Sequence, residues 1–366
     1  MLYKLESLRG VAALFVVLYH CQMKFGNFSF PFIQNSYLFV DFFFVLSGFV
    51  MSLAYGVRIQ SGLPFKAYIV SRLGRLYPLH ITLLFVWLIY LLSKQALYVY
   101  GYGGSEQFDE YDSFKSFFTH VFLIQSFGIN AGNSWNVPSW SISAELFAYI
   151  FFFAFSFFID KKNKIMPCII IAVTAYLFLV SLGRDSLGMT YDYGLIRCIG
   201  AFYLGVALHR IQIRIKNLSW SIKYIYLLEL IAVTLLVVTV NYASISSYAF
   251  MPALLAFMFA IFVFSSTKDG LIGGVLNNQY VRLIGLWSYS IYMVHSIVIS
   301  ITQLILEYVF NIIILEFNSL ERLSFSVFVI SVTIFLASLT YRYIEVPFRD
   351  KAKQYSKQLS MSKLNS

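Results

Sequence analysis

Residues 6–20 read ESLRGVAALFVVLYH, an apolar segment with Arg9 near one end and His20 at the other. Eleven residues at about 100° each return a helix to the same face within about 20°, and the rise along the axis is about 16 Å. We therefore interpret residues 7–27 as a membrane helix that carries both polar side chains on one face. The segment ends in Tyr19, His20 and Cys21 without a small-residue cleavage site, which favours a retained span over a signal peptide.

The composition extends this interpretation to the whole chain. Of its 366 residues, 59% are hydrophobic and only 12% are charged, far less charge than a soluble domain carries. Strands of about ten alternating residues, which would predict a β-barrel, are absent from the sequence. We predict an all-α polytopic integral membrane protein of about ten transmembrane helices. The expected spans are 7–27, 36–56, 77–97, 138–159, 164–183, 190–209, 221–242, 247–266, 283–308 and 323–344.

The distribution of basic residues predicts the orientation. If the N-terminus is cytoplasmic, most of the 27 lysines and arginines fall in cytoplasmic loops and the C-terminal tail. We therefore predict cytoplasmic termini, a membrane domain over 1–348 and a solvated basic tail over 349–366. The net charge of +10 then reflects topology and does not indicate nucleic-acid binding. The three cysteines, Cys21, Cys168 and Cys198, have no metal-ligand or disulfide spacing, so we expect no metal site.

Ionisable residues inside membrane spans are costly and mark either a functional site or a structural pair. Counting from the predicted outer ends places four of them about 8–11 Å below the outer surface, and His295 near the same level. Glu229 lies nearer the cytoplasm. The four are His20, Asp41, Glu145 and Arg197.

This convergence predicts one polar site. His20 would act as a general base or a nucleophile, with Asp41 orienting its ring. The simpler interpretations are that Arg9 is a membrane anchor, His20 a core histidine and Asp41 a helix cap, and that Glu145 pairs with Arg197.

Three other segments add candidate residues. In SRLGRLYPLH (71–80), Arg72 and Arg75 share a helical face, either as a phosphate clamp beside Arg9 or as ordinary cytoplasmic charge. Trp140 opens the fourth span, where it is either an interfacial anchor or a stacking surface for a sugar. A polar stripe on the ninth span either bonds neighbouring helices or lines a cavity; it consists of Ser288, Tyr292 and His295. The long outer connection 98–137 is expected to include a short interfacial helix and could cover a site.

The chain resembles the bacterial acyltransferase-3 family of membrane-bound acyltransferases. Six stretches carry the resemblance, in family order and over nearly the whole chain: LRGVAALFVVLYH (8–20), VDFFFVLSGFVMS (40–52), RLGRLYPLH (72–80), PSWSISAELFAY (138–149), WSYSIYMVHS (287–296) and YRYIEVPFRD (341–350). The chain ends soon after its last predicted span, so it resembles the stand-alone form that lacks a fused SGNH-type esterase domain.

The resemblance implies a role for each matching residue. His20 would be the essential histidine, and Glu145 would match the acidic residue of the fourth conserved stretch. Asp41 joins this catalytic group only as the residue expected from its position to orient His20. The acyl donor would be bound by Arg9, Arg72, Arg75 and Tyr77. Independently of the resemblance, their positions in the predicted spans lead us to expect an acceptor cavity lined by Trp140, Ser143, Arg197, Ser288, Tyr292 and His295. Ser47 and Ser143 are conceivable acyl carriers if transfer proceeds through an acyl-enzyme.

The expected function is that of a multi-pass O-acyltransferase in the bacterial cytoplasmic membrane. It would transfer an acetyl group from cytoplasmic acetyl-CoA, used as a co-substrate with no tightly bound cofactor, to a hydroxyl of a surface or lipid-linked glycan. Expected partners are the bilayer, the glycan, and a separate extracytoplasmic protein or a second copy of the chain. The alternatives are a succinyl or other acyl donor, a glycolipid or polysaccharide transporter or flippase, and a sensor with a decayed site.

Overall fold

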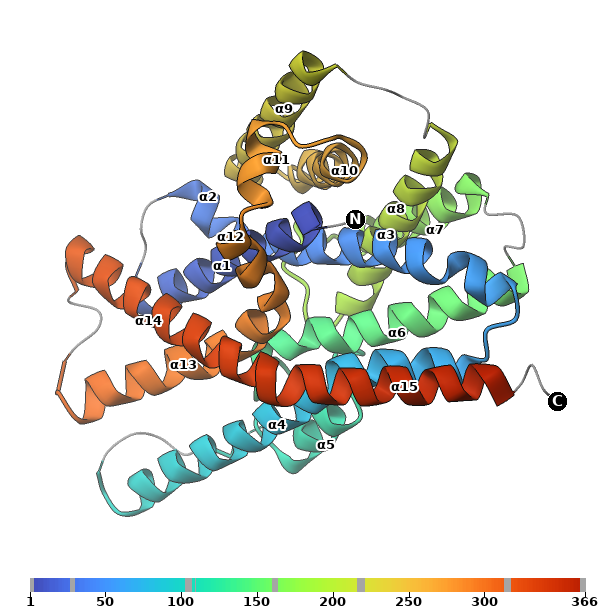
Figure 1. The fold of residues 1–366 in the computed structure, drawn as a ribbon. Coiled ribbons are helices and arrows are strands. Elements are labelled where there is room, and N and C mark those ends of the chain that lie inside the picture. Colours follow the sequence, from blue (N-terminus) through green and yellow to red (C-terminus); the bar gives the residue numbers. More distant parts are fainter. Residues whose placement is uncertain are drawn as a thin grey trace.

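The structure is a computed structural model, and it describes residues 3–26, 30–102, 107–108, 110–159, 164–215, 221–312 and 317–362. Helices account for 80% of the described residues, and these residues contain no strand. Figure 1 shows the long helices α3, α6, α4 and α15 side by side, α14 beside α13, and α9, α10 and α11 grouped at one edge of the molecule. The all-helical prediction is therefore confirmed.

The main helices follow the predicted order. Their bounds are α1 Tyr3–Phe25, α3 Phe39–Gln60, α4 Phe65–Val99, α6 Trp140–Ala154, α7 Ile165–Ser181, α8 Gly194–Arg214, α9 Ile222–Asn241, α10 Phe250–Ser266, α13 Ser288–Tyr308, α14 Ser319–Thr340 and α15 Val346–Ser362. Shorter helical segments are α2 Pro31–Gln34, η1 Ser36–Leu38, α5 Phe114–Val121, η2 Val137–Ser139, η3 Phe155–Ile159, α11 Leu271–Leu276, α12 Gln279–Leu286 and η5 Tyr341–Glu345.

Seven of the described helical runs are long and apolar enough to cross a membrane. Helices α7 and α10 are apolar but shorter, and α1 covers the first predicted span. Each of the ten predicted spans thus overlaps a helix, which supports a multi-pass membrane protein. The count of ten spans and the cytoplasmic placement of both termini stay predictions.

The C-terminal segment differs from the solvated tail that the sequence predicts. Helix α14 continues through the π-helical turn η5 into α15, so the predicted domain boundary at residue 348 lies inside an unbroken helical run. Helix α15 packs along the first half of α4 (Figure 1). Ser356 Oγ donates to the Ala67 carbonyl at 2.6 Å, and Ala352 packs against Gly74. The small residues Gly74 and Ala352 let α4 and α15 pack closely. Hydropathy alone cannot predict this contact. Residues 363–366 lie outside the described residues.

Close packing fixes helix α1 in the centre of the bundle. It contacts α12, α13 and α3, and Gly10 lies directly against the backbone of Gly285 in α12. An added Cβ at Gly10 would come within 2.6 Å of the Gly285 nitrogen, so glycine is required for this approach. The contact helps set the rotation of α1 and thereby the direction of its polar face.

Glu229 has a structural role near one end of the bundle. Its buried carboxylate accepts hydrogen bonds from the backbone N–H groups of Gly270, Ile272 and Gly273, at 2.8–3.1 Å. These are N–H groups at the start of α11, which a carboxylate stabilises. Glu229 is therefore separate from the polar site, as its predicted depth indicated.

Candidate active site

A basic cavity of about 200 Å³ lies at the Arg9 end of α1. Its cations come from three helices: Arg9 from α1, Arg72 and Arg75 from α4, and Arg349 and Lys353 from α15. Two carboxylates, Glu6 and Glu345, also line it. The structure thus brings together the three arginines that the sequence assigns to one site. A guanidinium pairs with two phosphate oxygens at once, so this group can bind a phosphorylated ligand.

The arginines of the basic cavity differ in how they are held. Arg72 donates to the Tyr55 hydroxyl at 2.7 Å and to Ser71 Oγ at 3.2 Å, and its guanidinium lies 4.7 Å from the Tyr55 ring centre. The Arg72 Nε atom is buried without a hydrogen-bond partner. Within the described part of the chain, Arg9 and Arg75 form no hydrogen bond or ion pair. These donors therefore have capacity left for a ligand.

A narrow polar cavity of about 30 Å³ adjoins the basic cavity, and Arg9 lines both. Its other polar lining includes Ser47, Glu145, Ser288 and Tyr292. Glu145 accepts short hydrogen bonds from the hydroxyls of Ser47 and Tyr149. Glu145 is therefore held by hydroxyls and does not pair with Arg197, in contrast to the simpler interpretation of the sequence.

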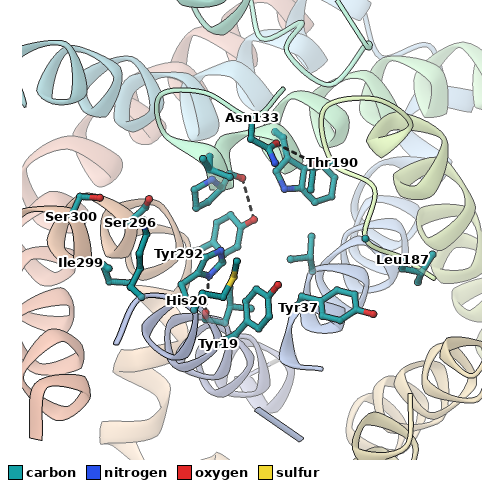
Figure 2. Close-up of a pocket in the computed structure, with 18 of the residues that line it drawn as sticks. Tyr19, His20, Tyr37, Asn133, Leu187, Thr190, Tyr292, Ser296, Ile299 and Ser300 are labelled. Atoms are coloured by element: carbon teal, nitrogen blue, oxygen red, sulfur yellow. Dashed lines mark hydrogen bonds between the residues drawn. The ribbon is translucent and has the colours of Figure 1, made fainter. Parts of the chain in front are cut away.

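A third cavity, of about 330 Å³, contains His20 and is called the histidine cavity below. Tyr292 lines both this cavity and the narrow one. Figure 2 shows Tyr19, His20, Tyr37 and Tyr292 grouped on one side, and Asn133 and Thr190 joined by a hydrogen bond on the other. Trp140 and Arg197 also line the cavity. Shared lining residues therefore connect a series of three cavities from Arg9 to His20.

Two neighbours fix the His20 ring, and neither is Asp41. His20 Nδ1 lies 2.9 Å from the Val16 carbonyl oxygen and 3.3 Å from His295 Nε2. A carbonyl only accepts, so Nδ1 carries the proton in the neutral ring and Nε2 holds the lone pair. The bond to Val16 lies one helical turn back, within α1 itself. The expectation that Asp41 orients His20 is wrong in this structure, because a local carbonyl satisfies that nitrogen.

Asp41 forms a buried ion pair with Arg197 instead. Arg197 Nη2 and Nε donate to the two carboxylate oxygens at 2.6 and 3.0 Å, and Nη1 donates to the Met189 carbonyl at 2.9 Å. Both side chains are buried, and the guanidinium lies 5.2 Å from the Trp140 ring centre. Paired bonds of this kind use both carboxylate oxygens. Asp41 therefore holds Arg197 in the wall of the histidine cavity.

Two residues of the predicted site face elsewhere. The Tyr77 hydroxyl donates to the Val121 carbonyl at 3.0 Å, and its side chain lines an apolar groove between α4 and α15 in place of the basic cavity. Ser143 donates to the Leu123 carbonyl at 2.5 Å and bonds the Ser126 hydroxyl at 2.8 Å. The Tyr77 hydroxyl ties α4 to the end of α5, and the Ser143 hydroxyl ties α6 to the segment after α5. Both residues therefore have a structural role and do not face a ligand, contrary to the prediction.

Of the remaining predicted residues, Ser288 and Tyr292 line cavities, whereas His295 lines none of the three. Ser288 lines the narrow cavity, and Tyr292 bonds Ser141 Oγ at 2.9 Å where the narrow and histidine cavities meet. His295 is fully buried behind His20, and its Nδ1 has no hydrogen-bond partner among the described residues. The polar stripe on α13 therefore both bonds neighbouring helices and lines the cavities.

Several lining residues were not predicted. Arg349 and Lys353 follow Glu345 at four-residue intervals, which places them on one face of a helix. This spacing has no significance in the solvated tail that the sequence predicts. Asn133 comes from the long outer connection and Thr190 from the segment before α8. The connection 98–137 includes a short helix, α5, and it lines the histidine cavity through Asn133 and Val137.

The site has no metal-ligand geometry in the part of the chain that the structure describes, where no three His, Cys, Asp or Glu side chains gather. Cys21, Cys168 and Cys198 are all buried and unpaired with one another. The three cavities offer a histidine (His20), three lining carboxylates (Glu6, Glu145 and Glu345) and a group of cations.

Fold and site together define a multi-pass membrane protein with a basic ligand cavity joined to a histidine-containing cavity. The family model described as an acyltransferase domain, acyltransferase-3, matches residues 2–342. The chain belongs to this family of membrane acyltransferases.

One curated relative adds a partial match. "Protein 2 in picA locus" from Rhizobium radiobacter is 41% identical over 98 residues, which cover 26% of this chain. The chain spans about half (48%) of that relative's length. No solved structure matches the chain.

Proposed function

We propose that the protein is an O-acyltransferase that moves an acetyl group from acetyl-CoA to a hydroxyl of a membrane-associated glycan. The observation that carries the proposal is a row of three cavities in which each cavity shares a lining residue with the next. Arg9 lines the basic and the narrow cavity, and Tyr292 lines the narrow and the histidine cavity. A donor bound by its phosphates at one end can therefore direct its thioester toward His20.

The length of the path suits the pantetheine arm of the donor. Arg9 and His20 are separated by about 16 Å along α1, comparable to an extended pantetheine. The narrow cavity of about 30 Å³ is too small to hold this arm as it stands. The side chains around Arg9 and Glu145 therefore move apart when the donor binds.

His20 acts as the general base in this proposal. Its Nε2 lone pair accepts the proton of the acceptor hydroxyl while the hydroxyl oxygen attacks the thioester carbonyl. The carbon–sulfur bond then breaks, and the imidazolium returns the proton to the leaving thiolate. The Val16 carbonyl holds Nδ1–H throughout, which fixes the tautomer that the step requires.

The histidine cavity has the character of a sugar site. It combines the aromatic side chains of Tyr19, Tyr37 and Trp140 with the polar side chains of Asn133 and Thr190. Aromatic rings pack on the apolar faces of sugars, and amides and hydroxyls bond their oxygens. A glycan acceptor therefore suits the cavity better than a small apolar acceptor.

Ser47 is the alternative carrier if transfer proceeds through an acyl-enzyme. Its hydroxyl lines the narrow cavity and already donates to Glu145, a carboxylate that can accept its proton. The Ser143 hydroxyl donates to a carbonyl and bonds a second serine, which makes it the weaker candidate. Trapping a labelled acyl group on the protein by acid quench, and losing it in Ser47→Ala, would establish this route.

The experiment that tests the proposed function uses the protein in nanodiscs of phosphatidylcholine with radiolabelled acetyl-CoA and a bacterial surface-glycan extract. We expect label transfer by the wild type and a loss of at least about a hundredfold in His20→Ala, the usual range for a general base. His209→Ala is the matched control, because His209 is also buried in the bundle but bonds Ser52 and lines neither cavity. Equal transfer by His20→Ala and wild type would refute the mechanism.

The same assay distinguishes the remaining alternatives. Succinyl-CoA in place of acetyl-CoA tests the donor, and release of free CoA reports turnover independently of the acceptor. If the wild type neither binds acetyl-CoA nor releases CoA, the proposed donor is wrong. A transporter would instead move a labelled glycolipid between leaflets without CoA.

A further inference from the structure

Two contacts show how α1 and α13 lie relative to each other. Gly10, early in α1, lies against Gly285 of α12, directly before α13. His20, later in α1, lies 3.3 Å from His295 of α13. The two helices therefore run in the same direction, and the end of α1 after His20 lies level with the second half of α13.

Lys24 is a cation at this end of α1, on the side of His20 away from the basic cavity. It follows His20 by four residues, so the two side chains share a helical face and their Cβ atoms are about 6 Å apart. Both residues line the histidine cavity. The Lys24 side chain is exposed and forms no hydrogen bond or ion pair with any residue that the structure describes. Its ammonium group is therefore available to a ligand that reaches His20.

The wall of the histidine cavity does not balance the charge of Lys24. Among the described residues that line the cavity, none is an aspartate or a glutamate. Arg197 also lines it, but Arg197 is paired with Asp41 at 2.6 Å. Of the charged residues in this lining, Lys24 is therefore the one whose charge is uncompensated.

A second lysine lies near Lys24 and has acidic neighbours. Lys94 of α4 interacts electrostatically with Lys24 and also with the carboxylates of Glu307 and Asp112. Lys94 is not among the residues that line the histidine cavity. The positive charge of Lys94 adds to the potential at Lys24, which favours an anion there.

Two hydroxyls of α13 face the same cavity. Ser296 and Ser300 are one helical turn apart, and both line the cavity (Figure 2). A hydroxyl inside an apolar helix commonly donates to the carbonyl four residues earlier, as Thr302 does to Val298 at 2.8 Å. Neither the Ser296 nor the Ser300 hydroxyl forms a hydrogen bond with another described residue. Both can therefore bond the oxygens of a sugar that extends from His20 toward Lys24.

We propose that the acceptor is an acidic glycan, and that Lys24 binds an anionic group on the acylated sugar or on the sugar next to it. This inference rests on the proposed function and names the substrate class of the same site. The lysine ammonium is a point charge, so it binds a carboxylate or a phosphate alike. The bound anion also stabilises the imidazolium that forms on His20 during transfer, one helical turn away.

The experiment removes the negative charge from the glycan and the positive charge from the protein separately. Three acceptors are compared: the bacterial surface-glycan extract as isolated, the extract with its carboxylates reduced to alcohols by carbodiimide and borohydride, and the extract with its phosphates removed by hydrogen fluoride. Transfer of label from acetyl-CoA is measured in phosphatidylcholine nanodiscs as kcat/KM per mass of glycan, for wild type, Lys24→Gln and Lys24→Arg. The control is Lys115→Gln, which removes a lysine of α5 that lines none of the three cavities.

We expect one of the two treatments to lower kcat/KM of the wild type at least about tenfold, the value of one charge-assisted hydrogen bond. The treatment that does so identifies the anion as a carboxylate or a phosphate. Lys24→Gln should show the same loss on the untreated extract and respond to neither treatment, whereas Lys24→Arg and Lys115→Gln should behave as wild type. The proposal is overturned if the wild type transfers equally to all three extracts, if Lys24→Gln transfers as wild type, or if a treatment lowers Lys24→Gln as much as wild type.

Anionic lipid headgroups are the other ligand for a lysine near a membrane surface, and a second arm tests them. The measurements are repeated in nanodiscs containing phosphatidylglycerol. If Lys24→Gln differs from wild type only there, and equally with all three extracts, Lys24 binds lipid and the acidic-glycan proposal is wrong. If the wild type releases no CoA and transfers label to no extract, the proposed function itself fails, so the two failures are distinguished.

Discussion

At the scale of single residues, the pairing of His20 with His295 has a consequence for turnover. His295 is fully buried, and its Nε2 lies 3.3 Å from His20 Nδ1, so it supports the face of the ring that points away from the histidine cavity. We predict that His295→Gln lowers kcat about tenfold and leaves the KM for acetyl-CoA unchanged, because the donor's phosphates bind elsewhere. Steady-state kinetics of CoA release measure both.

The control for this prediction is His209→Gln, which changes a buried histidine that bonds Ser52. It should keep kcat within about twofold. If His295→Gln raised KM and left kcat intact, His295 would belong to donor binding and not to the positioning of His20.

The buried pair of Asp41 and Arg197 gives a prediction about stability. Removing one partner leaves an uncompensated charge inside the bundle, which costs about 3–5 kcal/mol. We predict that Asp41→Asn lowers the thermal unfolding midpoint sharply in detergent, measured by tryptophan fluorescence. Asp41→Asn/Arg197→Met should recover most of that loss, because both charges are then gone. A double variant as unstable as the single one would contradict this reading of the pair.

Part of the candidate site could be predicted from residue patterns in the sequence. The spacing of Arg9 and His20 placed both on one face, and Arg72 and Arg75 do meet Arg9 in one cavity. The partners of Asp41 and His20 could not be predicted. These partners depend on how each helix is rotated about its own axis relative to its neighbours. The depth of a residue along a helix does not give that rotation.

At the scale of helices, the crossing of α3 and α8 is the most sensitive contact. Gly48 lies against the Phe202 carbonyl and Gly205 against the Val45 carbonyl, so an added methyl group at either would overlap backbone. We predict that Gly48→Ala or Gly205→Ala greatly reduces the yield of monodisperse protein in size-exclusion chromatography, because backbone cannot move aside as a side chain can. Gly274→Ala, a helical glycine with nothing within 4 Å, should purify as wild type.

The helix positions were predictable where apolar residues run continuously, and less so at the ends. Helix α4 begins at Phe65, although hydropathy places the third span at residues 77–97. The same holds for α15, which continues beyond the last apolar stretch. A hydropathy scan assigns charged segments to loops. A helix nevertheless continues through such a segment when a neighbouring helix packs alongside it.

At the scale of the whole molecule, the predicted orientation can be tested by labelling single cysteines. The native Cys21, Cys168 and Cys198 are buried, so background labelling should be low. We predict that a membrane-impermeant maleimide labels Ser61→Cys, between α3 and α4, only in inside-out vesicles, and Tyr100→Cys, after α4, in intact cells. The opposite pattern would invert the topology and place the basic cavity on the outer side.

The narrow cavity between Arg9 and Tyr292 has a consequence for the cell that makes this protein. A passage leading from a basic opening to a deep histidine would, if it stayed wide, offer water and protons a route across the bilayer. With only about 30 Å³ at its narrowest part, and a guanidinium facing it, the resting protein closes that route to cations. In the proposed mechanism, the side chains that part to admit the donor's arm would therefore also preserve the proton gradient while no donor is bound.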